Sequence, residues 1–114
     1  MIRRGEIVLV SFPFTDLITS KVRPALTVSS DSYNKTSGDA IFLFITTKKY
    51  DTKFDLFLNK THPDFKATGL KNPSTFRVSK LMCLEQNLAK RRLGRASKNV
   101  IKQVDTILRR LLFL

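Results

Sequence analysis

The chain has 114 residues, of which 42% are hydrophobic, so it can bury one core of ordinary size and is predicted to be a single domain over residues 1–114. With 21 Lys and Arg residues against 9 Asp and Glu residues, the net charge of +12 favours polyanionic partners: nucleic acid first, an acidic protein second and an anionic membrane last. No apolar run is long enough to span a membrane, and no signal-peptide pattern opens the chain, so we expect a cytoplasmic protein that does not bind membranes.

The first half of the chain is predicted to consist of strands joined by loops. Residues 7–12 form a short, β-branched apolar run that ends before Pro13, and residues 25–28 form a second run. The stretch 29–39 is rich in Ser, Asn, Asp and Gly and is expected to be a loop. The nearly continuous apolar run 40–45 is expected to be a strand buried on both faces.

The second half predicts three more strands and one helix. The strands lie at residues 54–58, 74–78 and 81–84, and a loop punctuated by Pro and Gly separates the first two. Apolar residues spaced by one helical turn from Val100 onward mark a helix with one apolar stripe, for which Ser97 is the expected N-cap. Several short strands and one terminal helix favour a mainly β fold, a small twisted barrel closed on one side by the C-terminal helix.

Arg23 precedes Pro24 at the start of the second strand. Pro24 fixes its own φ and pushes Arg23 toward an extended backbone, so the guanidinium is held at the rim of a sheet. A planar cation in that place suits bidentate capture of a phosphate or carboxylate. A solvated arginine at a strand end gives the same pattern, and only the rest of the chain favours binding.

Hydroxyl and ammonium groups follow the third strand at the point where its apolar pattern stops. Thr46 and Thr47 are followed by Lys48 and Lys49, and such groups bind phosphate oxygens. Thr46 equally fits the pattern of a strand residue whose hydroxyl bonds to neighbouring backbone. These four residues are therefore candidates for phosphate contacts, with a structural alternative for Thr46.

Arg77 interrupts the apolar alternation of the fifth strand. Because it lies between Phe76 and Val78, its side chain is expected on the opposite face of the sheet, which is either solvent or the wall of a pocket shared with Arg23. Phe76 is a candidate to stack on a base, although a phenylalanine in a strand is more commonly a core residue. Ser79 and Lys80 follow.

Several kinds of active site are missing from the sequence. His62 is the only histidine, Cys83 is expected to be a small buried hydrophobe, and no Gly-rich phosphate loop or paired-carboxylate motif occurs, so neither a metal site nor a cofactor is expected. An enzyme of this composition has to stabilise an anionic transition state with arginines, hydroxyls and backbone amides. Cleavage of RNA is the natural reaction, because the ribose 2′-hydroxyl supplies the nucleophile.

The order and spacing of these segments are similar to the MazF/PemK family of toxin endoribonucleases, the toxic half of type II toxin–antitoxin pairs. The resemblance covers most of the chain. It rests on Arg4 to Val10, Arg23 to Val28 with Asn34 after it, Ile45-Thr46, Gly69-Leu70, Ser74 to Leu81, Leu93 to Ser97 and the final helix.

The resemblance implies an SH3-like barrel of the MazF/PemK/CcdB type with a C-terminal helix, forming a homodimer whose joint groove binds single-stranded RNA. It also implies a metal-independent transesterification that leaves a 2′,3′-cyclic phosphate and a free 5′-hydroxyl. The family's catalytic positions map onto Arg23, Thr46 and Arg77. The implied partner is an antitoxin with an acidic tail. The implied contact with operator DNA is made through that antitoxin.

The remaining RNA-binding candidates surround these positions: Asp16, Lys21, Thr47, Lys48, Lys49, Phe76, Ser79 and Lys80. Two positions that are acidic in some relatives are here Ser79 and the 19–21 loop, which leaves the general base unassigned. Asp16 fits by geometry, but a loop aspartate is commonly a turn residue. Either Arg23 and Thr46 sustain the activity, or this copy is weak or inactive.

Two rival functions stay open at this point. The first is a non-catalytic RNA-binding barrel that uses its charge for phosphate contacts alone. The second is a toxin of the same fold that binds a protein target such as a topoisomerase.

Overall fold

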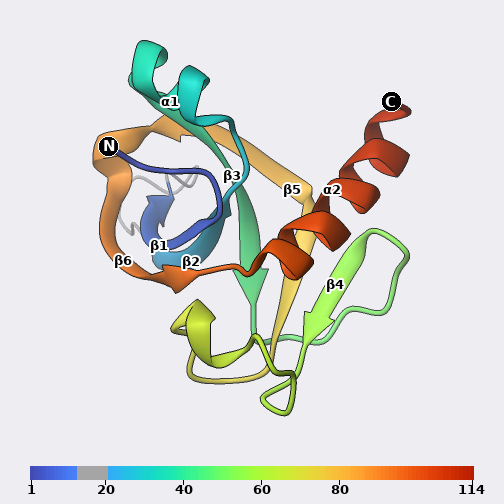
Figure 1. Ribbon diagram of the computed structural model, residues 1–114. Helices are drawn as coiled ribbons and strands as arrows, with labels where there is room; N and C mark the ends of the chain where they lie inside the picture. The colour runs from blue at the N-terminus through green and yellow to red at the C-terminus, as the bar shows by residue number, and fades with distance from the viewer. Residues whose placement is uncertain (13–20) are drawn as a thin grey trace.

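The computed structural model describes residues 1–12 and 21–114, and in this part of the chain six antiparallel strands form one strongly twisted sheet (Figure 1). The strands are β1 (Glu6–Phe12), β2 (Lys21–Thr27), β3 (Asp39–Thr46), β4 (Asp55–Leu58), β5 (Ser74–Glu85) and β6 (Ala89–Arg95). The described helices are α1 (Asp31–Ser37) and α2 (Lys98–Leu112), with two single 3-10 turns, η1 (Lys66–Thr68) and η2 (Gln86–Leu88). The strand order is β4-β5-β3-β2-β1-β6, so β4 and β6 are the edges.

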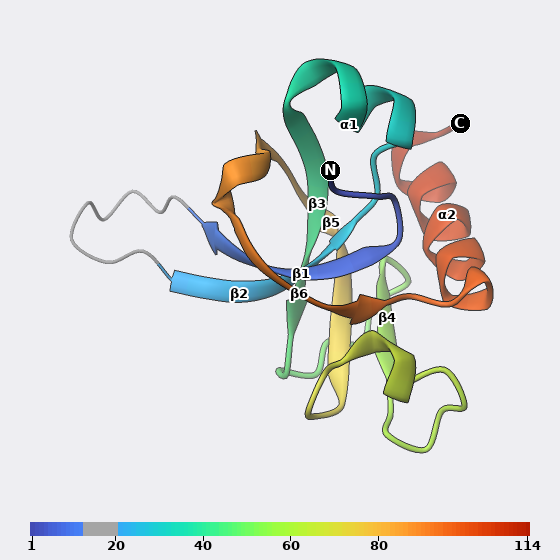
Figure 2. The same cartoon turned by 60° about the vertical axis from the view of Figure 1, so that its left-hand side comes forward.

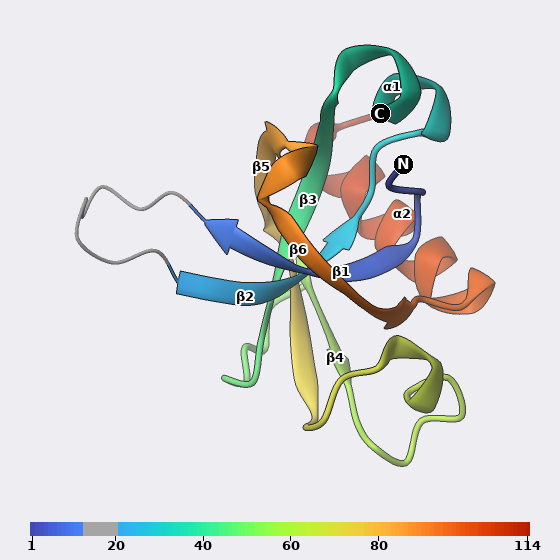
Figure 3. The ribbon, with the colours of Figure 1, turned by 90° about the vertical axis from the view of Figure 1, so that its left-hand side faces the viewer.

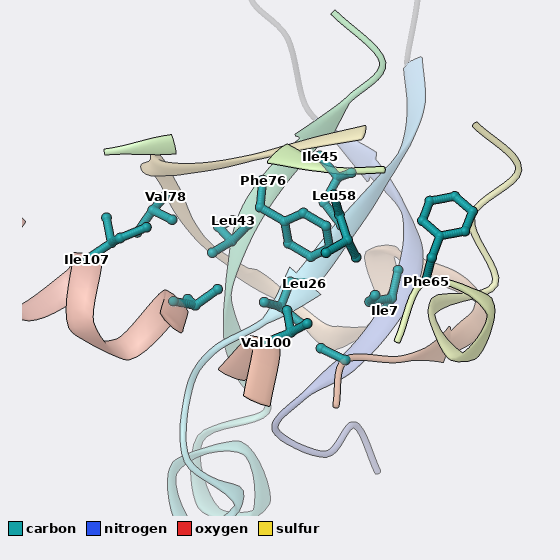
Figure 4. Packing of buried hydrophobic residues seen from close by; sticks show 12 residues of the cluster. Ile7, Leu26, Leu43, Ile45, Leu58, Phe65, Phe76, Val78, Val100 and Ile107 are labelled. Atoms are coloured by element: carbon teal, nitrogen blue, oxygen red, sulfur yellow. The ribbon is translucent and has the colours of Figure 1, made fainter. Parts of the chain in front are cut away.

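The sheet carries an apolar cluster on each face. The cluster on the helix face, the face that α2 covers, is shown in Figure 4 and includes Leu26, Leu43, Ile45 and Phe76. The cluster on the opposite face consists of Val8, Val10, Phe12, Ala25, Ala40, Phe42 and Leu84. Because side chains alternate along a strand, β3 contributes to both clusters. The expectation of a strand buried on both faces is confirmed.

The C-terminal helix forms as the apolar spacing predicts. The Ser97 hydroxyl accepts a hydrogen bond from the backbone N–H of Val100 at 3.1 Å, so Ser97 is the N-cap. Val100, Val104 and Ile107 are buried against the sheet, and each such aliphatic side chain contributes about 1.5–3 kcal/mol. Among the residues that the structure describes, no helix is long and apolar enough to cross a membrane.

The expectation of a loop over residues 29–39 is wrong, because α1 lies within it. The Ser30 hydroxyl caps the helix by accepting from the backbone of Tyr33 at 3.1 Å, and Gly38 ends it in the left-handed conformation at φ 76°. Asn34 is buried and donates to backbone carbonyl oxygens outside the helix. A seven-residue polar helix has no apolar periodicity, so only its two caps mark it in the sequence.

β5 is one strand, where two were expected. Its first part pairs with β3 up to Arg77, opposite Phe44, and pairing resumes at Leu81, opposite Leu43. The three residues between them, Val78 to Lys80, form a bulge that interrupts the ladder and lets the strand bend. Turn-like residues in the sequence therefore marked a bulge and not a strand end.

Two expectations for single side chains are corrected. Cys83 is exposed on β5 and not buried, and its Sγ lies 3.4 Å from the Tyr33 hydroxyl, a contact that raises the pKa of Tyr33 above its ordinary value. Phe76 is fully buried in the cluster on the helix face, so its ring has no surface to offer an RNA base. Phe76 is a core residue and not an RNA contact.

β6 is a further strand that the sequence did not reveal, because its basic residues resemble a solvated charge cluster. It pairs antiparallel with β1. Its other neighbour is η1, and the two backbones approach closely at two glycines, Gly69 and Gly94. A Cβ atom on Gly69 would lie 2.0 Å from the Leu93 carbonyl oxygen, and a Cβ atom on Gly94 would lie 2.4 Å from the Ala67 carbonyl oxygen. In the described chain β4 and β6 do not pair, so the expected barrel is an open, barrel-like sheet in which η1 packs on the edge strand β6.

We expect Gly94→Ala to lower the free energy of unfolding by about 3 kcal/mol, because the new methyl group would force η1 away from β6. The matched control is Gly38→Ala, which has a left-handed φ but no atom within 4 Å of the added Cβ, so it costs only the backbone strain of about 1–2 kcal/mol. Urea unfolding of both variants tests this. A Gly94→Ala protein as stable as the parent would show that the close contact contributes nothing.

Candidate active site

Arg23 lies on the face of the sheet opposite α2. It pairs with Val10 of β1, and both side chains belong to this face by strand alternation. The Arg23 guanidinium carbon is 5.8 Å from the centroid of the Phe44 ring, which stacks in turn on Phe12 at a centroid distance of 4.3 Å. The cation therefore rests on a stacked aromatic pair near the beginning of β2, as expected for a charge held at a sheet rim.

Thr46 ends β3 on the same face. β2 and β3 pair through Ala25 and Phe44, and a step of two residues outward on each strand leads to Arg23 and Thr46. The Thr46 hydroxyl oxygen accepts a hydrogen bond from the backbone N–H of Lys48 at 3.2 Å. This contact fixes the side chain and leaves the O–H group to donate, so the structural role and a phosphate contact are compatible.

Arg77 approaches from the other side of β3, where it is paired with Phe44. Its Nε donates to Asp55 Oδ1 at 2.8 Å, and the other Asp55 oxygen accepts from the Thr52 hydroxyl at 2.5 Å. The Asp55 side chain is 2% exposed and that of Arg77 18% exposed. The guanidinium carbon of Arg77 also lies 3.5 Å from the centroid of the Tyr50 ring. Arg77 is thus fixed on two sides, by a carboxylate and by an aromatic ring.

Two lysines extend the positive charge beyond the end of β3. Lys48 Nζ lies 5.2 Å from the centroid of the Tyr50 ring, and Lys49 Nζ lies 5.0 Å from that of Phe57. Both lysines are exposed. The Tyr50 ring therefore contacts two cations, Lys48 and Arg77.

Four further predicted site residues are exposed on the strands that carry the site or directly after them. Lys21 is exposed at the start of β2, Thr47 is exposed after β3, and Ser79 and Lys80 are exposed in the bulge of β5. Asp16 lies outside the described residues. Phe76 points away into the core, as noted above.

Sequence reasoning missed the residues that hold Arg77 in place. Asp55 lies in a strand with unclear alternation, and only the register of β4 on β5 shows that it stands opposite Arg77. Tyr50 lies in the connection before β4 and carries no motif.

Thr75, opposite Thr46, is fully buried, and within the described chain its hydroxyl has no hydrogen-bond partner.

The chemistry available here is the binding of an anion. Two guanidinium groups and one hydroxyl donor share one sheet face. Thr46 and Arg77 are diagonal neighbours on adjacent antiparallel strands, and such neighbours are typically about 7–8 Å apart. A phosphate group fits between donors at that spacing. Donors fixed before the substrate arrives stabilise developing negative charge without reorganising.

Solved structures with the same fold include toxins. An endoribonuclease in complex with its cognate antitoxin from a mycobacterial species is 18% identical, with a TM-score of 0.79 over 100% of this chain and 97% of that one. MazF from Deinococcus radiodurans is 20% identical (TM-score 0.76; 99% and 97% covered), and the Mycobacterium tuberculosis toxin MazF-mt6 is 14% identical (TM-score 0.77; 96% and 97% covered). A comparison with curated proteins gives no match.

The family model for the PemK-like, MazF-like toxin of type II toxin–antitoxin systems matches residues 3–112. This match covers nearly the whole chain, and it agrees with the mainly β sheet and C-terminal helix described above. The protein therefore belongs to the PemK/MazF family of toxins of type II toxin–antitoxin systems.

Proposed function

We propose that the protein is an endoribonuclease toxin that cleaves single-stranded RNA at the site formed by Arg23, Thr46 and Arg77. The observation that supports this most directly is the convergence of the three side chains on one face of the sheet, where the β3 ladders hold them. The endoribonuclease named in the antitoxin complex, and the MazF toxins of the same fold, support the same reaction class.

In the proposed reaction the ribose 2′-hydroxyl attacks the adjacent phosphorus and the 5′-oxygen leaves. The products are a 2′,3′-cyclic phosphate and a free 5′-hydroxyl, and no metal ion is required. Arg23 balances the charge that builds on the phosphate oxygens, and the Thr46 hydroxyl donates to one of them. Arg77 adds a second cation whose orientation Asp55 fixes. Asp16 stays a candidate for the general base.

The proposed partners follow from the charge of the same face. An acidic segment of the antitoxin that folds on docking would cover the groove near Arg23, Lys48 and Lys49 and exclude RNA. We further propose a homodimer whose two subunits form one RNA groove, contact with operator DNA through the antitoxin, and a cytoplasmic location.

Incubation of the purified protein with a long single-stranded RNA in the presence of EDTA should give discrete fragments. Each should end in a 2′,3′-cyclic phosphate, which mass spectrometry identifies. Retention of intact RNA would instead favour the non-catalytic RNA-binding barrel. Neither cleavage nor retention would favour a toxin that binds a protein target such as a topoisomerase.

Arg23→Ala should lower the rate of cleavage by about a hundredfold, because loss of one donor at an anionic site typically costs about 2.7–4 kcal/mol. Thr46→Val keeps the shape of the side chain and removes only the hydroxyl, so it should slow cleavage without preventing RNA binding. Single-turnover cleavage and filter binding measure both effects. Parent-like cleavage by a folded Arg23→Ala protein would remove Arg23 from the mechanism.

Asp55→Asn should lower the free energy of unfolding by about 2 kcal/mol, since a charge-assisted hydrogen bond is lost at a buried carboxylate. A double-mutant cycle with Arg77→Met isolates the pair, and we expect a coupling energy of about 1 kcal/mol or more. If the two substitutions are additive, the contact between Asp55 and Arg77 contributes no stability, and Asp55 does not hold the arginine in place.

A further inference from the structure

The net charge of the protein is concentrated away from the candidate active site. Residues 89–114, which form β6 and α2, contain eight Lys and Arg residues and one acidic residue, Asp105, so they carry +7 of the net +12. α2 covers the helix face of the sheet, whereas Arg23 lies on the opposite face. Figures 2 and 3 show the start of β2 and α2 at opposite ends of the molecule. Phosphate contacts at the cleavage site therefore do not account for this charge.

The basic residues of β6 form a path between the two regions. β6 begins with Ala89, which pairs with Val10, and Val10 pairs on its other side with Arg23. From this row the strand runs to the N-terminus of α2, as Figure 3 shows. Six exposed cations follow one another along β6 and the first turns of α2, and we call them the basic track: Lys90, Arg91, Arg92, Arg95, Lys98 and Lys102. Of these, Arg92 is ion-paired with Glu6 at 2.8 Å.

The far end of the track is a groove. A cavity of about 560 Å³ is lined by Arg95, Lys98 and Lys102 together with Arg4, Asp31 and Asp105. Both carboxylates already have partners, because Asp105 is ion-paired with the Arg4 guanidinium and Asp31 accepts from the Arg4 backbone at 2.7 Å. Within residues 1–12 and 21–114 no ion pair involves Arg95, Lys98 or Lys102. Four cations, Arg4, Arg95, Lys98 and Lys102, against Asp31 and Asp105 therefore leave this groove with a net charge of +2.

The composition of the track favours a nucleic-acid backbone over a protein partner. Protein interfaces depend on a buried aromatic or aliphatic anchor. Of the exposed large hydrophobic residues of the described chain, Met1 alone lines a cavity beside Lys90, Arg91 and Arg92, and none of them lines the groove at Arg95, Lys98 and Lys102. Phosphates are bound by charge alone, without an apolar anchor. With strand rise of about 3.3 Å and helix rise of about 1.5 Å per residue, the path is roughly 25 Å long, so it accommodates several nucleotides.

We propose that the basic track binds the phosphates of an RNA strand that extends beyond the cleavage site. This role rests on the proposed endoribonuclease function and adds a second, sequence-independent contact surface to it. The track sets how tightly long RNA binds, whereas Arg23 and Thr46 act on the scissile phosphate. Short and long substrates with the same central sequence should therefore differ in affinity and not in the rate of the chemical step.

The test removes three charges at the groove, in the variant Arg95→Gln/Lys98→Gln/Lys102→Gln. The matched control, Lys35→Gln/Lys60→Gln/Lys71→Gln, removes the same charge at exposed positions off the track. Binding is measured with 2′-O-methyl RNA of about 8 and about 24 nucleotides, which cannot be cleaved, over a range of salt concentrations. Cleavage is measured separately with ordinary RNA of the same two lengths. Thermal unfolding verifies that each variant is folded.

The groove variant should bind the long RNA at least roughly tenfold more weakly than the parent. Its slope of log affinity against log salt should fall by about 2, since each phosphate contact to a single strand contributes about 0.7. Short-RNA binding and the single-turnover rate should be unchanged, and the control should match the parent. The proposal would be overturned if both variants lost the same affinity for long RNA, or if the groove variant bound long RNA as tightly as the parent. A third outcome would also overturn it. If the groove variant binds poly-glutamate more weakly than the parent but binds long RNA equally well, the surface serves an acidic protein partner. Because the binding arm needs no cleavage, absence of activity would reject the proposed function without deciding this one.

Discussion

β3 pairs with β2 on one side and β5 on the other, and the register of these two ladders positions both the core and the candidate site. In this register Leu26, Leu43 and Phe76 fill the helix face, while Arg23, Thr46 and Arg77 share the opposite face. A slip of one residue would bury the charges and expose the core. The free energy of the apolar cluster therefore also fixes which sheet face the charged groups occupy.

Aromatic rings and one buried carboxylate allow several cations to stand close together. Arg23 rests on Phe44, and Arg77 is held between Tyr50 and Asp55. Each ring offers its negative face to a cation, which offsets part of the mutual repulsion before any phosphate binds. The site is positively charged and already ordered, so an incoming anion meets donors whose rotamer entropy was lost on folding.

Apolar patterning was sufficient to predict the core strands and α2, because burial of one face enforces a fixed spacing. It failed for α1 and β6, which are polar and are specified by caps and by pairing with distant segments. Arg23, Thr46 and Arg77 were predicted as site residues because each stands where an apolar pattern breaks. Asp55 was missed because its importance depends on the β4–β5 register, a long-range property that no local spacing records.

The contacts of the Tyr50 ring with Lys48 and Arg77 have an optical consequence. The chain contains no tryptophan and only two tyrosines, so Tyr33 and Tyr50 dominate its ultraviolet emission over the weakly fluorescent phenylalanines. Tyr33 lies on α1 beside Cys83, whereas Tyr50 contacts both cations at the end of β3. One of the two natural fluorophores of the protein is thus built into the charged site, where its quantum yield depends on the ionic surroundings of the ring.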